Sequence, residues 1–301
     1  MTVPVPPPGR HGGDGARLAA ALGVDPAAVL DLSASLNPVA PDPGEVVAKH
    51  LDALGRYPDA ATATAELAAV IAVGPDRLLL TNGGAEAIAL VAAEVGGGAD
   101  EPDFALHPRG DGGPRWRSNP HNPSGRLAAA DERAGVWDEA FYQLATGRWT
   151  RGDAEDGAVV VGSLTKLFAC PGLRLGYVVG PDPELIGRIR GRQPEWAVNG
   201  LAVAAVPDLL ATADLPDWAA AVARLRADLT ALLDEHDLDP QPSDANYVLC
   251  AHAGVLRDRL APHAVLVRDC ASFGLPGHAR VAVPDEAGLD RLANALEATA
   301  P

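Results

Sequence analysis

The stretch GAVVVGSLTKLFACPGLRLGYVVG, residues 157–180, contains the two clearest strand patterns in the chain. Its apolar runs AVVV and LGYVV are short and bounded by glycine, which is typical of strands buried on both faces. Between them lies the polar segment SLTK, which ends in Lys166. The pattern therefore predicts two core strands of an α/β sheet, with Lys166 in the segment that joins them.

Lys166 is one of only two lysines in a chain that has 24 basic residues in all. Arginine keeps its proton in proteins and cannot act as an amine nucleophile, whereas lysine can. The other lysine, Lys49, lies in the mixed helical pattern EVVAKHLDAL and is expected to be an ordinary surface residue. Lys166 is therefore the candidate for any chemistry that requires an amine.

Towards the N-terminus, the apolar run RLLLT, residues 77–81, predicts a third buried strand. The glycine turn NGG and the apolar helix AEAIALVAAEV follow it, as in the first half of a βαβ unit. Residues 96–125 show little periodicity, which predicts a loop with one strand at most. Three further helices are predicted at about 16–22, 44–54 and 64–73.

Towards the C-terminus, a long helix at about 216–236 has apolar residues every three or four positions and should bury one face. The runs NYVLCA, AVLVRDC and ARVAV predict three strands, and a helix near 288–298 closes the chain. We expect three parts: an N-terminal arm or part of the small domain (1–40), a large domain (41–212) and a small α+β C-terminal domain (213–301).

The amino-acid composition of the chain indicates which kind of ligand it binds. The 301 residues carry a net charge of −16, which disfavours nucleic acid or an anionic membrane as a partner and favours a small-molecule site. No apolar stretch is long enough to span a bilayer and no signal-peptide core is visible, so a cytoplasmic protein is expected. Cys170, Cys250 and Cys270 are widely spaced, which predicts core residues rather than disulfides or a metal site.

Six local motifs follow one another in a set order: NGGAE, SNPHNPSG, WDEAF, GSLTK, PGLRLGY and ARVAV. Taken singly, each has an ordinary explanation, such as a helix cap for Asp138 or a turn for Asn122. Together they resemble the aspartate-aminotransferase fold, the fold type I group of enzymes that depend on pyridoxal 5′-phosphate (PLP). The resemblance implies an α/β protein with a three-layer large domain and a smaller α+β C-terminal domain.

The same resemblance implies a role for each motif. The lysine of the SxxK segment, here Lys166, binds PLP covalently, and the aspartate of DEA[FY], here Asp138, keeps the pyridine nitrogen protonated. The cationic ring then serves as an electron sink for the substrate Cα. The other implied cofactor-binding residues are Asn122 at the ring hydroxyl, Phe104 on the ring face, Gly84, Ala85, Ser163 and Arg174 at the phosphate, and Tyr57 reaching a phosphate from the neighbouring subunit of a homodimer.

Further motifs resemble one branch of this group, the threonine-phosphate decarboxylases of cobalamin synthesis, which are close relatives of the histidinol-phosphate aminotransferases. These are the N-terminal HGG with ALGVDPAAVLDLSASLNP, the form DEAF with Phe141, the segment EWAVNGLA, and the ending VRDCASFGLPGHARVAV. Two arginines suit a substrate that carries both a phosphate and a carboxylate. The implied substrate-binding residues are His11, Gly12, Ser35, Asn122, Asn199, Arg268 and Arg280.

The chain also departs from the branch. It is much shorter between residues 86 and 119 and between 125 and 138, which predicts an abbreviated large domain, and Ser35 stands where an asparagine is usual. Three functions are therefore considered. The first is decarboxylation of L-threonine O-3-phosphate to (R)-1-amino-2-propanol phosphate, and the second is transamination of the histidinol-phosphate type. The third is a catalytically silent homologue that binds PLP or another ligand in a regulatory role.

Overall fold

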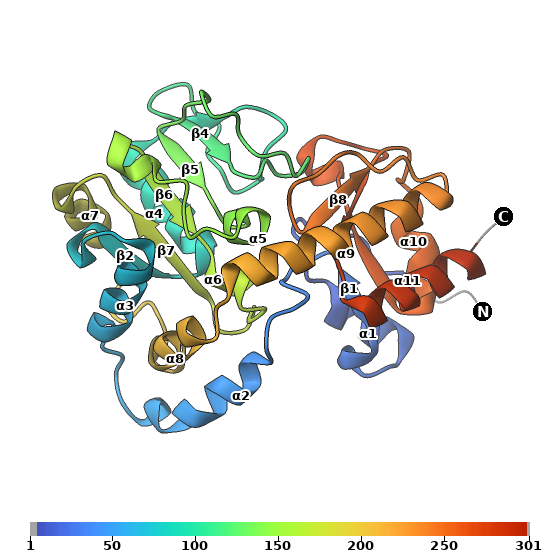
Figure 1. Ribbon diagram of the computed structural model, residues 1–301, viewed down its shortest axis with the longest axis horizontal. Coiled ribbons are helices and arrows are strands. Elements are labelled where there is room, and N and C mark those ends of the chain that lie inside the picture. Colours follow the sequence, from blue (N-terminus) through green and yellow to red (C-terminus); the bar gives the residue numbers. More distant parts are fainter. Residues whose placement is uncertain (1–4, 300–301) are drawn as a thin grey trace.

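The computed structural model describes residues 5–299 and contains two sheets, one in each lobe of the molecule (Figure 1). The larger sheet has the strand order β2-β7-β6-β5-β4-β3 and the smaller has the order β1-β9-β10-β8. The strands of the larger sheet are β2 (Leu78–Asn82), β3 (Gly98–Ala99), β4 (Arg115–Ser118), β5 (Val136–Asp138), β6 (Val159–Gly162) and β7 (Leu175–Val179). Those of the smaller sheet are β1 (Leu30–Leu32), β8 (Tyr247–Cys250), β9 (Val265–Asp269) and β10 (Ala279–Ala282).

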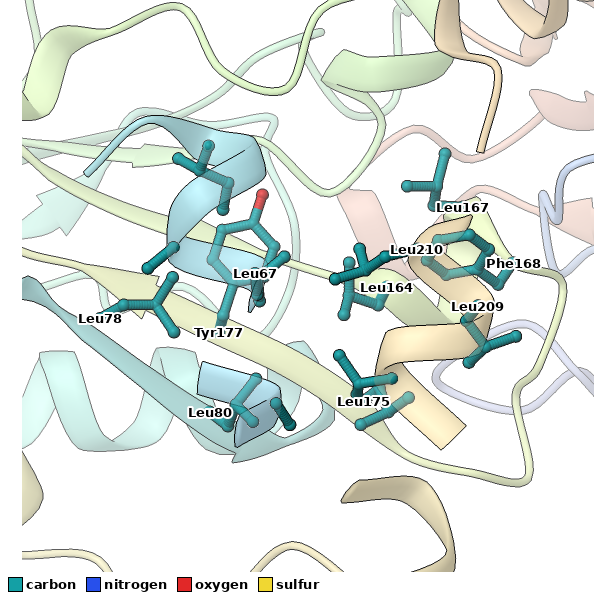
Figure 2. Close-up of a cluster of buried hydrophobic side chains, with 14 of the residues drawn as sticks. Leu67, Leu78, Leu80, Leu164, Leu167, Phe168, Leu175, Tyr177, Leu209 and Leu210 are labelled. Atoms are coloured by element: carbon teal, nitrogen blue, oxygen red, sulfur yellow. The ribbon is translucent and has the colours of Figure 1, made fainter. Parts of the chain in front are cut away.

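Helices cover both faces of the larger sheet. On one face, helices α3 (Ala61–Ile71) and α8 (Gly200–Ala211) bury Leu78 and Leu80 of β2 together with Tyr177 of β7 (Figure 2). On the other face, α4 (Gly83–Val95) and α7 (Pro183–Arg190) pack against Leu79, the residue between those two leucines. The side chains of β2 thus alternate between two hydrophobic cores, which confirms the predicted three-layer α/β architecture.

The two strands predicted on either side of Lys166 are β6 and β7, and they pair antiparallel. β7 also pairs antiparallel with β2, whereas β3, β4, β5 and β6 are mutually parallel. β2 therefore runs parallel to β3, and α4 connects β2 at one edge of the sheet to β3 at the other. The predicted βαβ unit is present, with four strands lying between its two ends.

Parallel neighbours are usually joined through a helix. Here β3, β4 and β5 are joined instead by residues 100–114 and 119–135, and the described chain has no α-helix between α4 and the short α5 (Tyr142–Thr146). This part of the larger sheet is the abbreviated region expected from the sequence. It holds two short strands, β3 and β4, rather than one at most.

The long helix α9 (Leu215–Glu235) connects the two lobes (Figure 1). Its first half contributes Trp218 and Val222 to the core of the large lobe, and its second half contributes Leu229 and Leu233 to that of the small lobe. The small lobe also contains α1 (Gly15–Leu22), α10 (Leu256–Leu260) and α11 (Glu286–Ala298). None of the helices in residues 5–299 has the length and apolar character needed to cross a bilayer.

The N-terminal segment belongs to the smaller sheet in this structure. β1 pairs in parallel with β9, where Leu32 faces Val267. One predicted helix, at 44–54, was wrong in part, since α2 spans only Pro43–Val47 and residues Ala48–Gly55 form a 3-10 helix. Gly44 and the two β-branched valines lie in α2 itself, so intrinsic helix propensity does not explain the 3-10 form of the residues that follow.

Candidate active site

A cavity of about 350 Å³ lies between the two sheets. Three of its residues follow the carboxyl ends of parallel strands: Gly84 after β2, Asp138 at the end of β5 and Ser163 after β6. Such ends form the usual binding crevice of an α/β sheet. The predicted site residues that line the cavity are His11, Gly12, Gly84, Ala85, Phe104, Asn122, Asp138, Ser163, Lys166, Arg174, Arg268 and Arg280.

Lys166 lies in the single-turn helix α6 (Leu164–Leu167), directly after β6. Its Nζ donates a hydrogen bond of 2.7 Å to the backbone oxygen of Ala34. Burial, together with the positive charges of Arg280 and Arg174, lowers the pKa of Lys166 to about 8. The amine is thus closer to its neutral, nucleophilic form than an ordinary surface lysine.

The part of the cavity around the N-terminus of α4 can bind an anion. Gly83 begins the 13-residue helix α4 with a φ of 77°, a conformation that favours glycine. A Cβ atom at Gly83 would lie 2.5 Å from Nη2 of Arg174, so the guanidinium lies directly against this helix N-terminus. Free N–H groups, the helix dipole and a guanidinium together favour a phosphate group.

The same cavity also presents a carboxylate. The Oδ1 atom of Asp138 accepts a hydrogen bond of 3.0 Å from the backbone N–H of Ala140, and its Oδ2 lies 2.9 Å from Nε2 of His107. His107 was not predicted, because it lies in a loop without periodic signal and no motif marks it. Phe104, three residues earlier, lines the cavity, and its ring lies 5.7 Å from that of His107.

These groups fit PLP. The cofactor requires an amine for its aldehyde, an anion site for its phosphate and a carboxylate for its pyridine nitrogen. Lys166, the N-terminus of α4 with Arg174, and Asp138 supply these three in one cavity. Asn122 adds an amide, whose Oδ1 accepts a hydrogen bond of 2.5 Å from Nη1 of Arg280.

Two buried arginines lie on the small-lobe side of the cavity. Arg268 of β9 and Arg280 of β10 are direct cross-strand partners and are only 4% and 6% exposed. Arg268 donates to the backbone oxygens of Gly9 and Arg10 and, at 2.7 Å, to Oγ of Ser272. The guanidinium of Arg280 lies 4.5 Å from the ring centroid of Tyr247, and its Nε is buried without a hydrogen-bond partner in the described residues.

Three predicted site residues do not line this cavity. Ser35 is buried behind it, and its backbone oxygen accepts a hydrogen bond of 2.9 Å from the Asn246 side chain. The side chain of Asn199 caps α8 by accepting a bond from the backbone N–H of Ala202. Tyr57 is 76% exposed and stacks on Trp196 with ring centroids 4.5 Å apart.

The fold and this set of side chains define a class of protein, and the comparison with known families agrees with it. The chain belongs to the aminotransferase class I and II family, whose sequence pattern matches residues 117–296. Its cofactor is pyridoxal 5′-phosphate, as the resemblance implied. The predicted fold type I architecture is confirmed as well.

Individual relatives cover most of the chain. It is 31% identical to the threonine-phosphate decarboxylase of Salmonella typhimurium, over 95% of both proteins. It is 28% identical to the histidinol-phosphate aminotransferase of Halorubrum lacusprofundi, over 88% of this chain and 87% of that protein. The fold matches the histidinol-phosphate aminotransferase of Sinorhizobium meliloti in complex with pyridoxal-5′-phosphate, with a TM-score of 0.81 at 18% identity over 95% of this chain and 94% of that one.

The alignment with the Salmonella protein also bears on the short segment of the large domain. It runs over 348 positions, more than the 301 residues of this chain. Part of the relative therefore has no counterpart here, in keeping with the helix-free connections between β3, β4 and β5.

Proposed function

We propose that the protein removes CO₂ from L-threonine O-3-phosphate, giving (R)-1-amino-2-propanol phosphate for the nucleotide loop of cobalamin. The observation that carries this proposal is the direct cross-strand pairing of Arg268 with Arg280 at the cavity. Like charges placed opposite one another destabilise a sheet, and here both are buried. A ligand with two anionic groups would offset that cost, and threonine phosphate carries a phosphate and a carboxylate.

When bound, PLP supplies an attachment point for the substrate amine and a conjugated ring that accepts the electron pair left at Cα as CO₂ departs. Asp138 holds a proton on the ring nitrogen, because a carboxylate in this position favours the cationic ring. Lys166, once its Nζ is free, delivers a proton to Cα in place of the lost carboxylate. Its lowered pKa lets the amine exchange protons near neutral pH.

The remaining polar groups orient the substrate. Arg280, held by Asn122, binds the carboxylate, while Arg268 binds the phosphate together with His11. Burial, with the charges of Arg268 and Arg10, lowers the pKa of His11, and its Nδ1 is buried without a partner in residues 5–299. A neutral imidazole N–H can donate to a phosphate oxygen in such a position. Ser35 and Asn199 act only through the segments that they fix.

We also propose that the active form is a homodimer. Tyr57 and Trp196 form an exposed stacked pair, and Leu51 and Leu54 nearby are 55% and 71% exposed. Exposed apolar and aromatic groups gathered in this way are typical of a protein interface. A second copy of the chain would cover them and bring Tyr57 to the phosphate end of its partner's cavity.

A transaminase of the histidinol-phosphate type is the second candidate, favoured by the relative from Halorubrum lacusprofundi. Both reactions use the same lysine, carboxylate and phosphate site. They differ in which bond at the substrate Cα lies perpendicular to the cofactor ring, the bond to the carboxylate or the bond to hydrogen.

The deciding experiment supplies the purified, PLP-loaded protein with threonine phosphate or with histidinol phosphate. Release of CO₂ from threonine phosphate without conversion of PLP to pyridoxamine phosphate supports the decarboxylase. Rapid conversion of PLP by histidinol phosphate, with no CO₂ released from threonine phosphate, would establish the transaminase instead. Binding of PLP with neither reaction would point to the silent homologue.

A further inference from the structure

Three buried ionisable side chains lie in a line behind the cavity. His107 Nε2 lies 2.9 Å from Oδ2 of Asp138, and its Nδ1 lies 3.7 Å from Oδ1 of Asp103. Asp103 is 2% exposed and the His107 side chain is fully buried. Only Asp138 reaches the cavity, so the imidazole separates a deep carboxylate from the one that serves the cofactor.

Asp103 is rigidly held. Its carboxylate accepts hydrogen bonds from the backbone N–H of Phe104 at 2.7 Å, from the backbone N–H of Ser118 at 3.1 Å and from the Ser118 hydroxyl. All three donors stabilise the ionised form of the acid. Ser118 is the last residue of β4, so the sheet itself sets the position of Asp103.

This geometry determines the charges of His107 and Asp103. Burial opposes a charge on the imidazole, yet the two flanking carboxylates outweigh it and raise the pKa of His107 to about 9. Burial likewise opposes ionisation of Asp103, but His107 and the Ser118 donors hold its pKa at about 2. Near neutral pH the Asp103 carboxylate is therefore negatively charged and the His107 imidazole positively charged.

Other groups around the line leave that pattern unchanged. The His107 ring is flanked by the uncharged rings of Phe104 and Trp116. His121 lines a second pocket together with Asp103 and favours the ionised acid when charged, while Arg109 donates to the backbone oxygens of Asp103 and His107. Residues 5–299 contain no group of three or more His, Cys, Asp and Glu side chains placed to hold a metal ion.

We propose that Asp103 is a positioning residue: its carboxylate keeps the His107 ring positively charged and oriented, and His107 in turn fixes the Asp138 carboxylate that serves the cofactor ring nitrogen. The inference rests on the proposed PLP chemistry for the role of Asp138. A neutral histidine could accept a hydrogen bond or donate one, whereas an imidazolium can only donate.

The first test uses cofactor-free protein and needs no turnover. The ring signals of isotope-labelled histidine are followed by NMR against pH, and among the eight histidines that of His107 is identified by its loss in H107Q. In the wild type we expect His107 to remain protonated through pH 7 and to titrate near pH 9. In D103N its midpoint should fall by about one pH unit or more, a tenfold loss of proton affinity.

The matched control is D100N, because Asp100 lies in the same loop but is exposed and pairs with Arg115. It should leave the His107 midpoint where it is. An unchanged midpoint in D103N would overturn the proposal. If D103N does not fold, the wild type alone still decides, because a His107 midpoint below pH 7 would overturn it as well.

The second test asks whether Asp103 acts through His107. In the wild-type background D103N should weaken PLP binding by about threefold to tenfold, measured by equilibrium titration of cofactor-free protein. In the H107Q background, where the side chain cannot carry a charge, the same change should have less than about a twofold effect. Equal losses in both backgrounds would show a merely structural Asp103. Neither test uses substrate, so failure of the decarboxylase assignment would leave both results standing.

Discussion

The amine of Lys166 and the backbone oxygen of Ala34 form a 2.7 Å hydrogen bond across 132 positions of sequence. Asn37 strengthens this contact, since its backbone N–H donates to the oxygen of Lys166 and its side chain donates to that of Leu167. The segment after β1 therefore holds the lysine of the large lobe in place. Movement between the lobes would act directly on Lys166, the residue that we expect to carry the cofactor.

The first prediction concerns covalent attachment. Borohydride reduction of the PLP-loaded protein should label Lys166 alone, because its amine faces the cavity while Lys49 lies exposed on the 3-10 helix that follows α2. Peptide mapping measures the label, and Lys49→Ala should retain all of it while Lys166→Ala loses it. A label on Lys49 would contradict the assignment.

The second prediction is a pH dependence. The Lys166 amine attacks an aldehyde only after losing its proton, and burial lowers its pKa from 10.5 to about 8. The reactive fraction therefore rises with pH and levels off above about pH 9, one unit past the midpoint. The rate at which PLP attaches to cofactor-free protein should follow that curve. A rate that keeps climbing to about pH 10.5 would instead indicate an ordinary lysine.

The third prediction tests the phosphate end. Gly83→Ala should weaken PLP binding by about tenfold or more, because the new methyl would meet Arg174 at 2.5 Å and the backbone has a φ of 77°. The control is Gly187→Ala in the exposed interior of α7, where a Cβ meets nothing within 4 Å. That control should keep its PLP affinity and gain roughly 0.5 to 1 kcal/mol of stability. Equal affinities in both variants would argue against the proposed phosphate site.

Much of the large domain could be predicted from sequence because its signals are local. The apolar runs that became β2, β6 and β7 are buried on both faces, so composition alone marks them. The motifs with Asp138 and Lys166 lie at the ends of such strands, and their order along the chain carried the resemblance. These residues meet in one cavity because the strands that present them are neighbours in the sheet.

The loop of residues 100–114 could not be predicted in the same way. It has no periodicity, and two of its ionisable residues act only through partners farther along the chain, Ser118 for Asp103 and Asp138 for His107. Burial of a charged residue in a loop depends on tertiary contacts that no local pattern records. The sequence indicated the lack of helices in this region only indirectly, because the chain is shorter here than in the branch that it resembles.

Asn199 shows that a matching motif does not by itself tell us what a side chain does in this chain. Its segment EWAVNGLA is one of those that carry the resemblance. In this chain, however, the Asn199 side chain caps the N-terminus of α8 and donates to the backbone oxygen of Leu173. Asparagine is among the best N-cap residues, so the local structure explains it fully. Ser35 differs, since its backbone oxygen accepts the bond from Asn246 while its hydroxyl is buried without a partner in the described residues.

The fourth prediction concerns assembly. If Tyr57 completes the cavity of a second copy, Tyr57→Ala and Lys166→Ala each inactivate the homodimer for different reasons. Mixing the two proteins under exchange conditions should restore activity, because one site of each hybrid dimer then contains both native residues. The maximum is about a quarter of the wild-type activity per dimer at random assortment. An active species that sediments as a monomer, or a mixture that stays inactive despite proven exchange, would contradict it.

The last prediction concerns substrate choice. If Arg268 binds the substrate phosphate, Arg268→Ala should lower kcat/KM for threonine phosphate by about one to two orders of magnitude, since a charge-assisted hydrogen bond contributes roughly 1.5 to 3 kcal/mol. For free threonine, which should be a poor substrate of the wild type, Arg268→Ala should leave kcat/KM almost unchanged, because free threonine has no phosphate for Arg268 to bind. Arg224→Ala, at an exposed position on α9, is the matched control and should behave as the wild type with both substrates. Arg268 also holds Gly9 and Arg10, so the melting temperature of each variant is measured alongside. An equal loss with both substrates would mean that Arg268 only supports the fold, and the phosphate would then have to bind elsewhere in the cavity.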